Sequence, residues 1–499
     1  MNLPLIAQVQ IEPHAGDPLK TACDCLIIAI GDSAALSSAA VKIDGLTQGW
    51  LSRAIESGTI KTAFGELTLM PMLPGLTSES SPRAILWAGL GNVAKLDRGK
   101  AFEWAATTTR RLSDAPRQRI VMSIDAIADR EFDDALVAGA ISGCSGQSIY
   151  MSDPKVIAPE RIDFAGLSPD SLVLGKAIGD SINVVRRLVN EPPNRIYPES
   201  FADAATAVAN EVGLEIAVWD ENRLAAEDCR AILAVGEASV RPPRLVIMHH
   251  RGGSKSQAPL VMVGKGVTFD SGGLSIKPTE GMADMKCDMA GAATVVGVMR
   301  AIAMLKLPIN VVGLCGLAEN MIGGDAFKLG DVIETRNGIM VEILNTDAEG
   351  RVVLADVLDV AVQLQPAAIV DLATLTGACM VALGRDVSGL MTNNEALCSE
   401  IRTSAAAEGE YVWQLPMFEF YGEHIKSKVA DIKNVGDARW GGAITAAKFL
   451  ERFVGEVPWV HIDIAGPAFA ESPKPHRDAG ATGVMLRTLV GWLNSRATG

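Results

Sequence analysis

Residues 345–351, with the sequence NTDAEGR, place two carboxylates and a guanidinium on alternate positions. Asp347, Glu349 and Arg351 are separated there only by an alanine and a glycine. The apolar run IMVEIL precedes them and VVLADVLDVAVQL follows, which predicts a junction between a buried strand and a helix. At such a junction Asp347 could cap the helix and Glu349 could favour its first turn. The stretch alone leaves helix capping and chemistry both open.

Two more predicted strands are followed by residues that could form a ligand-binding site. LVMVGKGVTFDSGG puts Lys265 and Asp270 just past one strand, among four glycines, and IVDLATLTGA ends another strand in Thr374. Ligands of open α/β sheets bind beyond the carboxyl ends of the strands, and glycines let the backbone approach them closely. Considered alone, Lys265 is explained as a solvated or ion-paired side chain, and Asp270, which precedes Ser-Gly-Gly, is explained as part of a turn.

A fourth carboxylate, Asp288, lies in a segment with the pattern of a buried helix. GMADMKCDMAGAATVVGVM is rich in Ala and Gly from about residue 282 onward. A buried carboxylate is costly unless it is paired or bound to a metal, so a salt bridge to Lys277 or Lys286 is one reading. The other is a shared crevice in which two divalent cations keep four carboxylates ionised: Asp270, Asp288, Asp347 and Glu349.

Histidine contributes little to this pattern. The chain has six histidines and no H-E-x-x-H spacing, and His249 and His250 would point to opposite faces of a strand. A zinc site of the usual histidine type is therefore not expected. Oxygen ligands alone favour Mg²⁺ or Mn²⁺.

The elements that must position these residues describe an α/β protein with two domains. We expect a small N-terminal α/β domain over residues 1–165, with strands at 25–31, 83–91 and 119–125 and helices at 100–112 and 132–142. A long helix from about residue 171 opens a larger domain, residues 166–499. Its short, continuous apolar runs, separated by helical stretches, predict a mostly parallel central sheet flanked by helices. These runs lie at 214–220, 244–250, 258–266, 309–317, 340–344 and 367–375.

Composition narrows the partners and the compartment. The net charge of -14 disfavours nucleic acid, because phosphate binding needs clustered Lys and Arg. Eight cysteines without a disulfide-like spacing predict free thiols in a reducing compartment. The start of the chain has no basic signal region, and no run of about 18 uncharged apolar residues occurs. We expect a cytoplasmic protein that does not bind membranes.

The stretch GLGNVA, at 89–94, fits a dinucleotide-binding fingerprint. The next acid at a strand end, however, comes about 30 residues further on rather than about 20, which argues against dinucleotide binding.

The motifs resemble those of the leucyl (cytosol) aminopeptidases, which are di-metal exopeptidases. NTDAEGR looks like the signature of that family, and the likeness extends through VGKGVTFDSGGLSIKP, MKCDMAGAA, DLATLTGA, GGAITAAKFL and HIDIAG. It covers nearly all of residues 170–499. Over the first third it rests on size and on the α/β pattern.

The resemblance implies two ions of Zn²⁺, Mn²⁺ or Mg²⁺ bridged by Asp270 and Glu349. Lys265 and Asp288 would complete the tighter site, and Asp347 the more exchangeable one. The residues alone do not lead to a lysine ligand. Lys265 would have to be deprotonated, which burial beside a dication favours.

The resemblance also implies a mechanism and an assembly. Metal-bound hydroxide would attack the scissile carbonyl, with Lys277 stabilising the oxyanion and Arg351 holding a bicarbonate ion as general base. The first side chain of the peptide would enter an apolar, leucine-preferring pocket that includes Met285, Thr374, Leu375 and Ala465. The family forms homohexamers, in which the N-terminal domain would serve assembly or regulation.

Two other functions stay open at this stage. Carboxylate-bridged metals also serve phosphoesterases, although these need more cationic groups than Lys277 and Arg351. A hexameric scaffold without catalysis is the second alternative, and the intact set of seven polar site residues argues against it.

Overall fold

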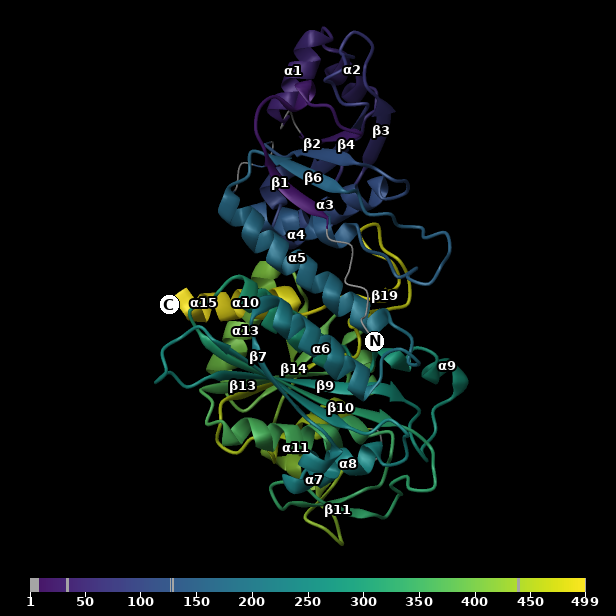
Figure 1. Cartoon of the computed structure of the whole chain (residues 1–499), viewed down its shortest axis with the longest axis vertical. Coiled ribbons are helices and arrows are strands. Elements are labelled where there is room, and N and C mark those ends of the chain that lie inside the picture. Colours follow the sequence, from purple (N-terminus) through teal and green to yellow (C-terminus); the bar gives the residue numbers. More distant parts are fainter. Residues whose placement is uncertain (1–8, 33–35, 126, 128–129, 438–439, 499) are drawn as a thin grey trace.

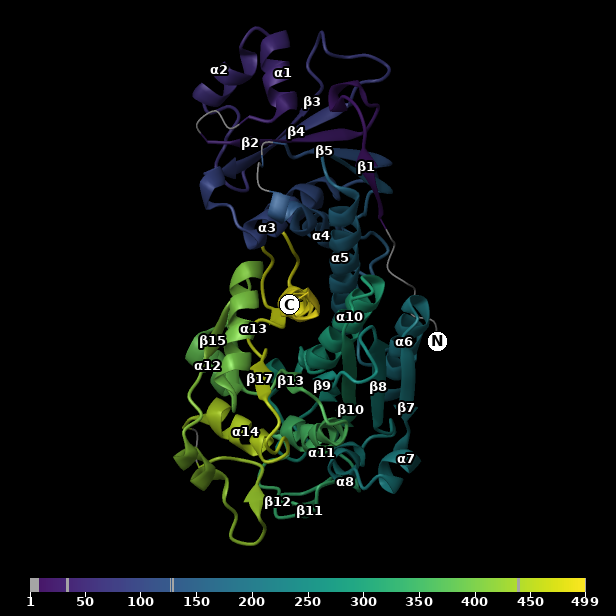
Figure 2. The ribbon, with the colours of Figure 1, turned by 90° about the vertical axis from the view of Figure 1, so that its left-hand side faces the viewer.

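The computed structural model describes residues 9–32, 36–125, 127, 130–437 and 440–498. A smaller and a larger α/β unit lie one above the other along the longest axis of the molecule (Figures 1 and 2). The smaller one is built on a six-stranded sheet and the larger one on an eight-stranded sheet. This confirms the predicted fold class. The domain boundary after residue 165 stays a prediction.

The N-terminal sheet has the strand order β1-β6-β5-β2-β4-β3, and each pair except β3/β4 is parallel. Its strands are β1 (Gln10–His14), β2 (Cys25–Gly31), β3 (Leu67–Pro71), β4 (Ala84–Gly91), β5 (Arg119–Ser123) and β6 (Arg161–Ala165). Helices α1 (Ser38–Leu46) and α2 (Trp50–Glu56) cover the outer face, and α3 (Arg98–Leu112) and α4 (Asp133–Gly143) cover the face toward the larger unit (Figure 1). The helices predicted at 100–112 and 132–142 correspond to α3 and α4.

The large sheet has a parallel centre and antiparallel flanks. Its order is β15-β14-β17-β13-β9-β10-β8-β7, and β17, β13, β9 and β10 run parallel, while β8, β7 and β14 pair antiparallel to their inner neighbours. The strands are β7 (Glu215–Trp219), β8 (Arg244–Arg251), β9 (Leu260–Asp270), β10 (Asn310–Asn320), β13 (Ala368–Ala373), β14 (Ser388–Thr392), β15 (Val412–Gln414) and β17 (Trp459–Asp463). The parallel centre brings the carboxyl ends of β17, β13, β9 and β10 to one edge.

Helices cover both faces of the large sheet (Figure 2). The face toward the N-terminal unit carries α5 (Pro169–Asn190), α6 (Pro198–Val212), α10 (Ala290–Met304), α13 (Glu395–Glu408) and α15 (Leu486–Thr498). The opposite face carries α7 (Glu221–Ala226), α8 (Arg230–Gly236), α11 (Glu349–Gln363) and α14 (Gly442–Glu451). One apolar core is continuous from the N-terminal sheet through α3, α4, α5 and α10 to the first face, and a second core lies under α8, α11 and α14.

Short elements complete the described chain. They are the helices α9 (Thr279–Met282) and α12 (Gly377–Leu383), the 3₁₀ turns η1 (Pro18–Lys20), η2 (Val93–Lys95), η3 (Arg130–Phe132), η4 (Met285–Cys287) and η5 (Glu419–Ile425), and two small sheets formed by β11 (Val332–Glu334), β12 (Met340–Glu342) and β16 (Ile432–Lys433) and by β18 (Phe469–Ala470) and β19 (Gly480–Ala481).

Two local predictions were wrong. The run at 340–344 is not a strand of the central sheet, because β12 belongs to the separate sheet β11-β12-β16. Asp288 is not inside a helix but directly follows the 3₁₀ turn η4, and α10 begins only at Ala290. Apolar periodicity does not distinguish one continuous helix from a tight turn that leads into a helix, since both bury the same side chains.

The helical stretch Thr279–Met304 is long and apolar enough to cross a membrane, and 94% of its most apolar window is buried inside the protein. Burial of this kind is typical of a core helix. It is the one such stretch within the part of the chain that the structure describes.

Candidate metal centre

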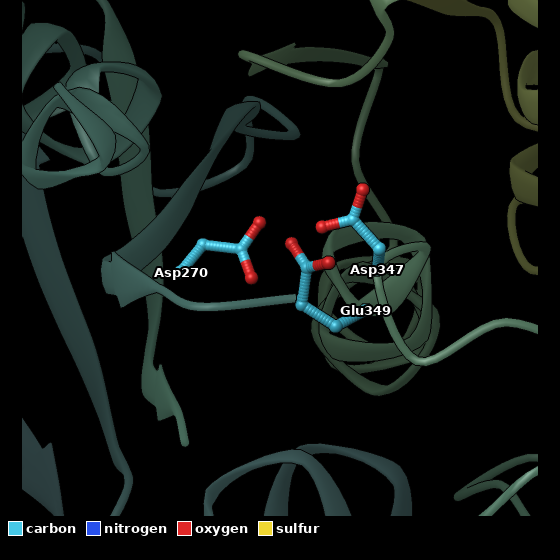
Figure 3. A group of neighbouring side chains, drawn as sticks. All are labelled: Asp270, Asp347 and Glu349. Carbon is cyan, nitrogen blue, oxygen red and sulfur yellow. The ribbon is translucent and has the colours of Figure 1, made fainter. Parts of the chain in front are cut away.

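Three carboxylates meet at the carboxyl edge of the large sheet. Asp270 is the last residue of β9, and Glu349 is the first residue of α11. Oxygens of Asp270, Asp347 and Glu349 lie within 4.8 Å of one another. The three side chains point toward one another across the gap between the strand and the helix (Figure 3).

The turn after β9 fixes the carboxylate of Asp270. Gly272 and Gly273 have φ of 85° and 60°, a left-handed conformation that glycine adopts without steric cost. The tight turn lets Gly272 N donate to Asp270 Oδ1 at 2.9 Å, and Asn320 Nδ2 donates to the same oxygen at 2.8 Å. Asn320 ends β10, so the strand-end rule used above could have found it.

Two lysines each bridge a pair of carboxylates. Lys265 Nζ lies 2.8 Å from Asp288 and 2.9 Å from Glu349, and Lys277 Nζ lies 2.8 Å from Asp270 and 2.5 Å from Asp347. The alternative reading, a salt bridge of Asp288 to Lys277 or Lys286, is therefore wrong in its partner, which is Lys265. The ammonium group of Lys286 instead donates to the backbone oxygen of Asn190.

Three of these carboxylates are harder to ionise than an acid in water. Burial, together with the charge of Asp270, raises the pKa of Asp288, Glu349 and Asp347. Burial alone would lower the pKa of Lys265 and Lys277, but the surrounding carboxylates outweigh it and raise the pKa of both. If all four carboxylates are ionised, the two ammonium groups balance only two of the four negative charges.

The donor set fits divalent cations. Glu349 Oε2 is buried and has no hydrogen-bond partner among the described residues, and carboxylate oxygens are ligands for Mg²⁺, Mn²⁺ and Zn²⁺. A bound divalent cation would supply the positive charge that these carboxylates need to stay ionised.

Gly350 gives Lys265 room to reach its partners. A Cβ at this position would lie 2.3 Å from Lys265 Cε and 2.6 Å from Lys265 Nζ. The glycine of NTDAEGR therefore leaves the space that the lysine side chain occupies.

Arg351 is buried and carries its charge without an ion pair in the described ranges. Its Nη1 donates to the backbone oxygen of Asn434 at 2.8 Å, and its Nε is buried without a partner. Burial lowers the pKa of Arg351 to about 10. A guanidinium with free N–H groups is suited to hold a planar oxyanion.

The loop after β13 touches the site through Thr374. Its hydroxyl donates to Asp288 Oδ1 at 2.7 Å, and its backbone oxygen accepts from Lys265 Nζ at 3.0 Å. Leu375 follows it, and Ala465 follows the neighbouring parallel strand β17. Met285 lies in η4, just before Asp288. That these residues form one side-chain pocket stays a prediction.

Sequence comparison decides the family. The model of the cytosol aminopeptidase catalytic domain matches residues 183–490, and the model of the family's N-terminal domain matches residues 27–154. This chain belongs to the cytosol aminopeptidase family. The resemblance in the motifs is confirmed, and so is the prediction of a metal-dependent exopeptidase.

Several cytosol aminopeptidases are similar along nearly their whole length. The probable cytosol aminopeptidase of Rhodopirellula baltica is 62% identical over 445 residues, which is 89% of this chain and 87% of the relative. The cytosol aminopeptidase of Pseudomonas aeruginosa is 37% identical over 495 residues, which is 96% of this chain and 98% of the relative.

Solved structures show the same architecture. The bottromycin maturation enzyme BotP in complex with Mn has a TM-score of 0.82 at 32% identity, covering 95% of this chain and 99% of that chain. A tomato leucine aminopeptidase variant has a TM-score of 0.86 at 29% identity, covering 99% of this chain and 98% of that chain.

Proposed function

We propose that this cytosol aminopeptidase releases N-terminal amino acids, with leucine-like residues preferred, by means of two divalent metal ions and a bicarbonate ion. One observation carries the proposal: two lysines, one buried and one half-buried, each bridge two carboxylates at the carboxyl edge of the parallel centre of the large sheet. A metal held by these ligands could also receive the free α-amine of the substrate, which would restrict cleavage to the N-terminal residue.

The ligands divide into a tighter and a more exchangeable site. Asp270 and Glu349 are assigned to both ions, Lys265 and Asp288 to the tighter one and Asp347 to the other. Zn²⁺ or Mn²⁺ suits a set that contains an amine, and Mg²⁺ suits the carboxylates. The Mn in the BotP structure supports a divalent ion at such a site.

Bound metals would lower the pKa of a shared water and polarise the scissile carbonyl. The residues of the chain then have separate tasks. Lys265 would hold the tighter ion as a neutral amine, with its proton released to solvent. Lys277 would then be free of Asp270 and Asp347 and would donate to the oxygen that becomes negative in the transition state. Arg351 holds bicarbonate through its unpaired N–H groups, so that a base is present in a site without a free carboxylate.

The substrate's first side chain is assigned to a pocket that includes Met285, Thr374, Leu375 and Ala465. An apolar pocket separates leucine from smaller residues by about 1–3 kcal/mol per methylene. The preference for leucine-like residues is therefore graded rather than absolute.

We further propose a cytoplasmic homohexamer with peptides as its partners. The names of the relatives and the eight buried free thiols support the compartment. Large apolar side chains that stand exposed on one stretch of this aromatic-poor chain support an assembly surface: Tyr411, Trp413, Phe418, Phe420 and Trp440.

An assay on two substrates tests the activity. The purified enzyme with Mn²⁺ should cleave a leucyl anilide and leave an aryl phosphate intact. Cleavage of the phosphate with no peptidase activity would contradict the proposal and show that the enzyme is a phosphoesterase.

A further inference from the structure

Asp463 is a buried carboxylate that the mechanism above does not use. It ends β17, is fully buried, and forms no ion pair with the described residues. Its Oδ1 accepts from Leu375 N at 3.2 Å and from Ala465 N at 3.1 Å, and its Oδ2 accepts from Thr376 Oγ1 at 2.7 Å. A buried charge held only by neutral donors is costly, and an asparagine of nearly the same shape would avoid that cost.

The peptide group between Thr374 and Leu375 is held at both ends. Its N–H donates to Asp463, and its carbonyl oxygen accepts from Lys265 Nζ at 3.0 Å. A negative charge on the N–H side strengthens the carbonyl as an acceptor, because hydrogen bonds in a chain polarise one another. A single peptide unit therefore connects Asp463 to Lys265.

The hydroxyl of Thr376 keeps this carboxylate in place. Thr376 Oγ1 accepts from Cys379 N at 3.0 Å and donates to Asp463 Oδ2, so it caps the first turn of α12 and fixes the rotation of the carboxylate. The remaining oxygen, Oδ1, is then aimed at Leu375 and Ala465. These are two of the residues assigned to the side-chain pocket, and they lie in the loops that follow the neighbouring strands β13 and β17.

We propose that Asp463 is a positioning residue that sets two properties of the enzyme: the metal affinity of the tighter site and the selectivity of the side-chain pocket. It acts on the metal through the Thr374–Leu375 peptide group and Lys265, and on the pocket through the N–H groups of Leu375 and Ala465. The inference rests on the proposed two-metal function. Partners of this kind around a metal site change affinity or activity by about 10–100-fold when they are removed.

Asp463→Asn removes the charge and keeps the shape. Asp371→Asn is the matched control: Asp371 is equally buried, lies on the adjacent strand, and bonds Trp459 Nε1 and His461 Nδ1 at 2.6 Å instead of the loop. For each variant we would measure Zn²⁺ affinity by competition with a chromophoric chelator, the thermal midpoint of the metal-free protein, and kcat/KM on leucyl and alanyl anilides.

We expect Asp463→Asn to bind the tighter ion about 10–100-fold more weakly and to lower the leucyl-to-alanyl ratio. The control should keep both values at wild-type level. A lower thermal midpoint with unchanged affinity and ratio would overturn the inference and leave Asp463 a structural residue, and so would equal losses in both variants. A wild-type protein that binds no metal would instead refute the proposed function.

Thr376→Val decides the matter if Asp463→Asn does not fold. This variant frees Asp463 Oδ2 while the carboxylate and its charge remain. Loss of that one hydrogen bond should weaken Zn²⁺ binding roughly threefold to tenfold. A folded Thr376→Val protein with wild-type affinity and selectivity would contradict the role of Asp463.

Discussion

At the scale of single residues, the site is a balance between four carboxylates and two ammonium groups. Lys265 and Lys277 have similar surroundings, since each bridges two acids. Their proposed roles differ: Lys265 is assigned as a metal ligand and Lys277 as a contact to the substrate. The reason is that Lys265 is nearly inaccessible to solvent, whereas the side chain of Lys277 keeps 17% of its exposure. A ligand must be buried against the ion, and a group that meets substrate must be reachable.

Replacing Lys277 by alanine should slow the chemistry and leave binding intact. The amine is proposed to meet charge that exists chiefly in the transition state, so kcat should fall by about 10²–10³ while KM changes little. Steady-state kinetics on a leucyl anilide, with metal content measured on the same sample, checks this. Lys426→Ala, at an exposed lysine paired with Glu423, is the control and should leave kcat unchanged. Loss of metal, or an unaltered kcat, would make Lys277 a purely structural partner of Asp270 and Asp347.

At the scale of elements, the start of α11 is shaped around Lys265. Gly350→Ala would put a Cβ 2.3 Å from Lys265 Cε, so the lysine must move away from Asp288 and Glu349. We expect a folded protein whose tighter site binds Zn²⁺ about 10–100-fold more weakly, as measured by chelator competition. Gly45→Ala, in helix α1 with no atom within 4 Å of the added carbon, should keep wild-type affinity. Equal affinity in both variants would show that the site tolerates the methyl group.

Helix α11 also carries a buried acid that makes stability depend on pH. Asp356 accepts from Ala231 N, Ile232 N and Arg336 N at 2.8, 3.0 and 2.8 Å, which ties the start of α8 to α11. Burial raises the pKa of Asp356 to about 7. Because the folded pKa lies above the unfolded value of about 3.9, the folded state keeps a proton that the unfolded chain has lost. The contribution of this group to stability therefore falls as pH rises from about 4 to 7, by up to about 4 kcal/mol.

Asp356→Asn removes this titration. Urea unfolding of the metal-free protein between pH 4.5 and 7.5 should show a free energy of unfolding that changes less steeply with pH in the variant than in the wild type. Identical slopes in the two proteins would exclude Asp356 as a source of the pH dependence.

The sequence predicted strands in which most side chains are apolar. β2 is apolar throughout, and β9 and β13 remain mostly apolar despite Lys265 and Asp371; all three lie where we expected them. β17 was not predicted as a strand, because a histidine and an aspartate make up two of the five residues in WVHID. These polar residues are buried only because partners distant in sequence satisfy them: His461 meets Asp371, and Asp463 meets Leu375 and Thr376.

The prediction of the site from the sequence was limited in the same way. The acids at strand ends followed from the parallel sheet, since its carboxyl ends share one edge. Which lysine would bridge which pair of acids did not follow, because the turn before α10 sets the direction of Asp288. Asn320 and Asp463 have no local signal beyond their position at the ends of β10 and β17.

At the scale of the whole molecule, the exposed aromatic residues between Tyr411 and Trp440 predict association of the chain with further copies. Light scattering should give about 316 kDa, six times the chain mass of 52.6 kDa. A monomer of full activity would contradict the proposed hexamer. Trp413→Asp should shift the mass distribution toward smaller species, since a charge would then be buried at the interface, whereas Val240→Asp, at an exposed position outside this stretch, should not.

The central claim is that two divalent ions in the carboxylate crevice produce the peptidase activity. The most direct test removes the metals with a chelator, returns Zn²⁺ or Mn²⁺ stepwise, and records metal per chain together with leucyl anilide cleavage. We predict no cleavage in the metal-free protein and recovery that approaches its maximum near two ions per chain. Full activity in metal-free protein, or a protein with two ions per chain that does not cleave the anilide, would contradict the claim.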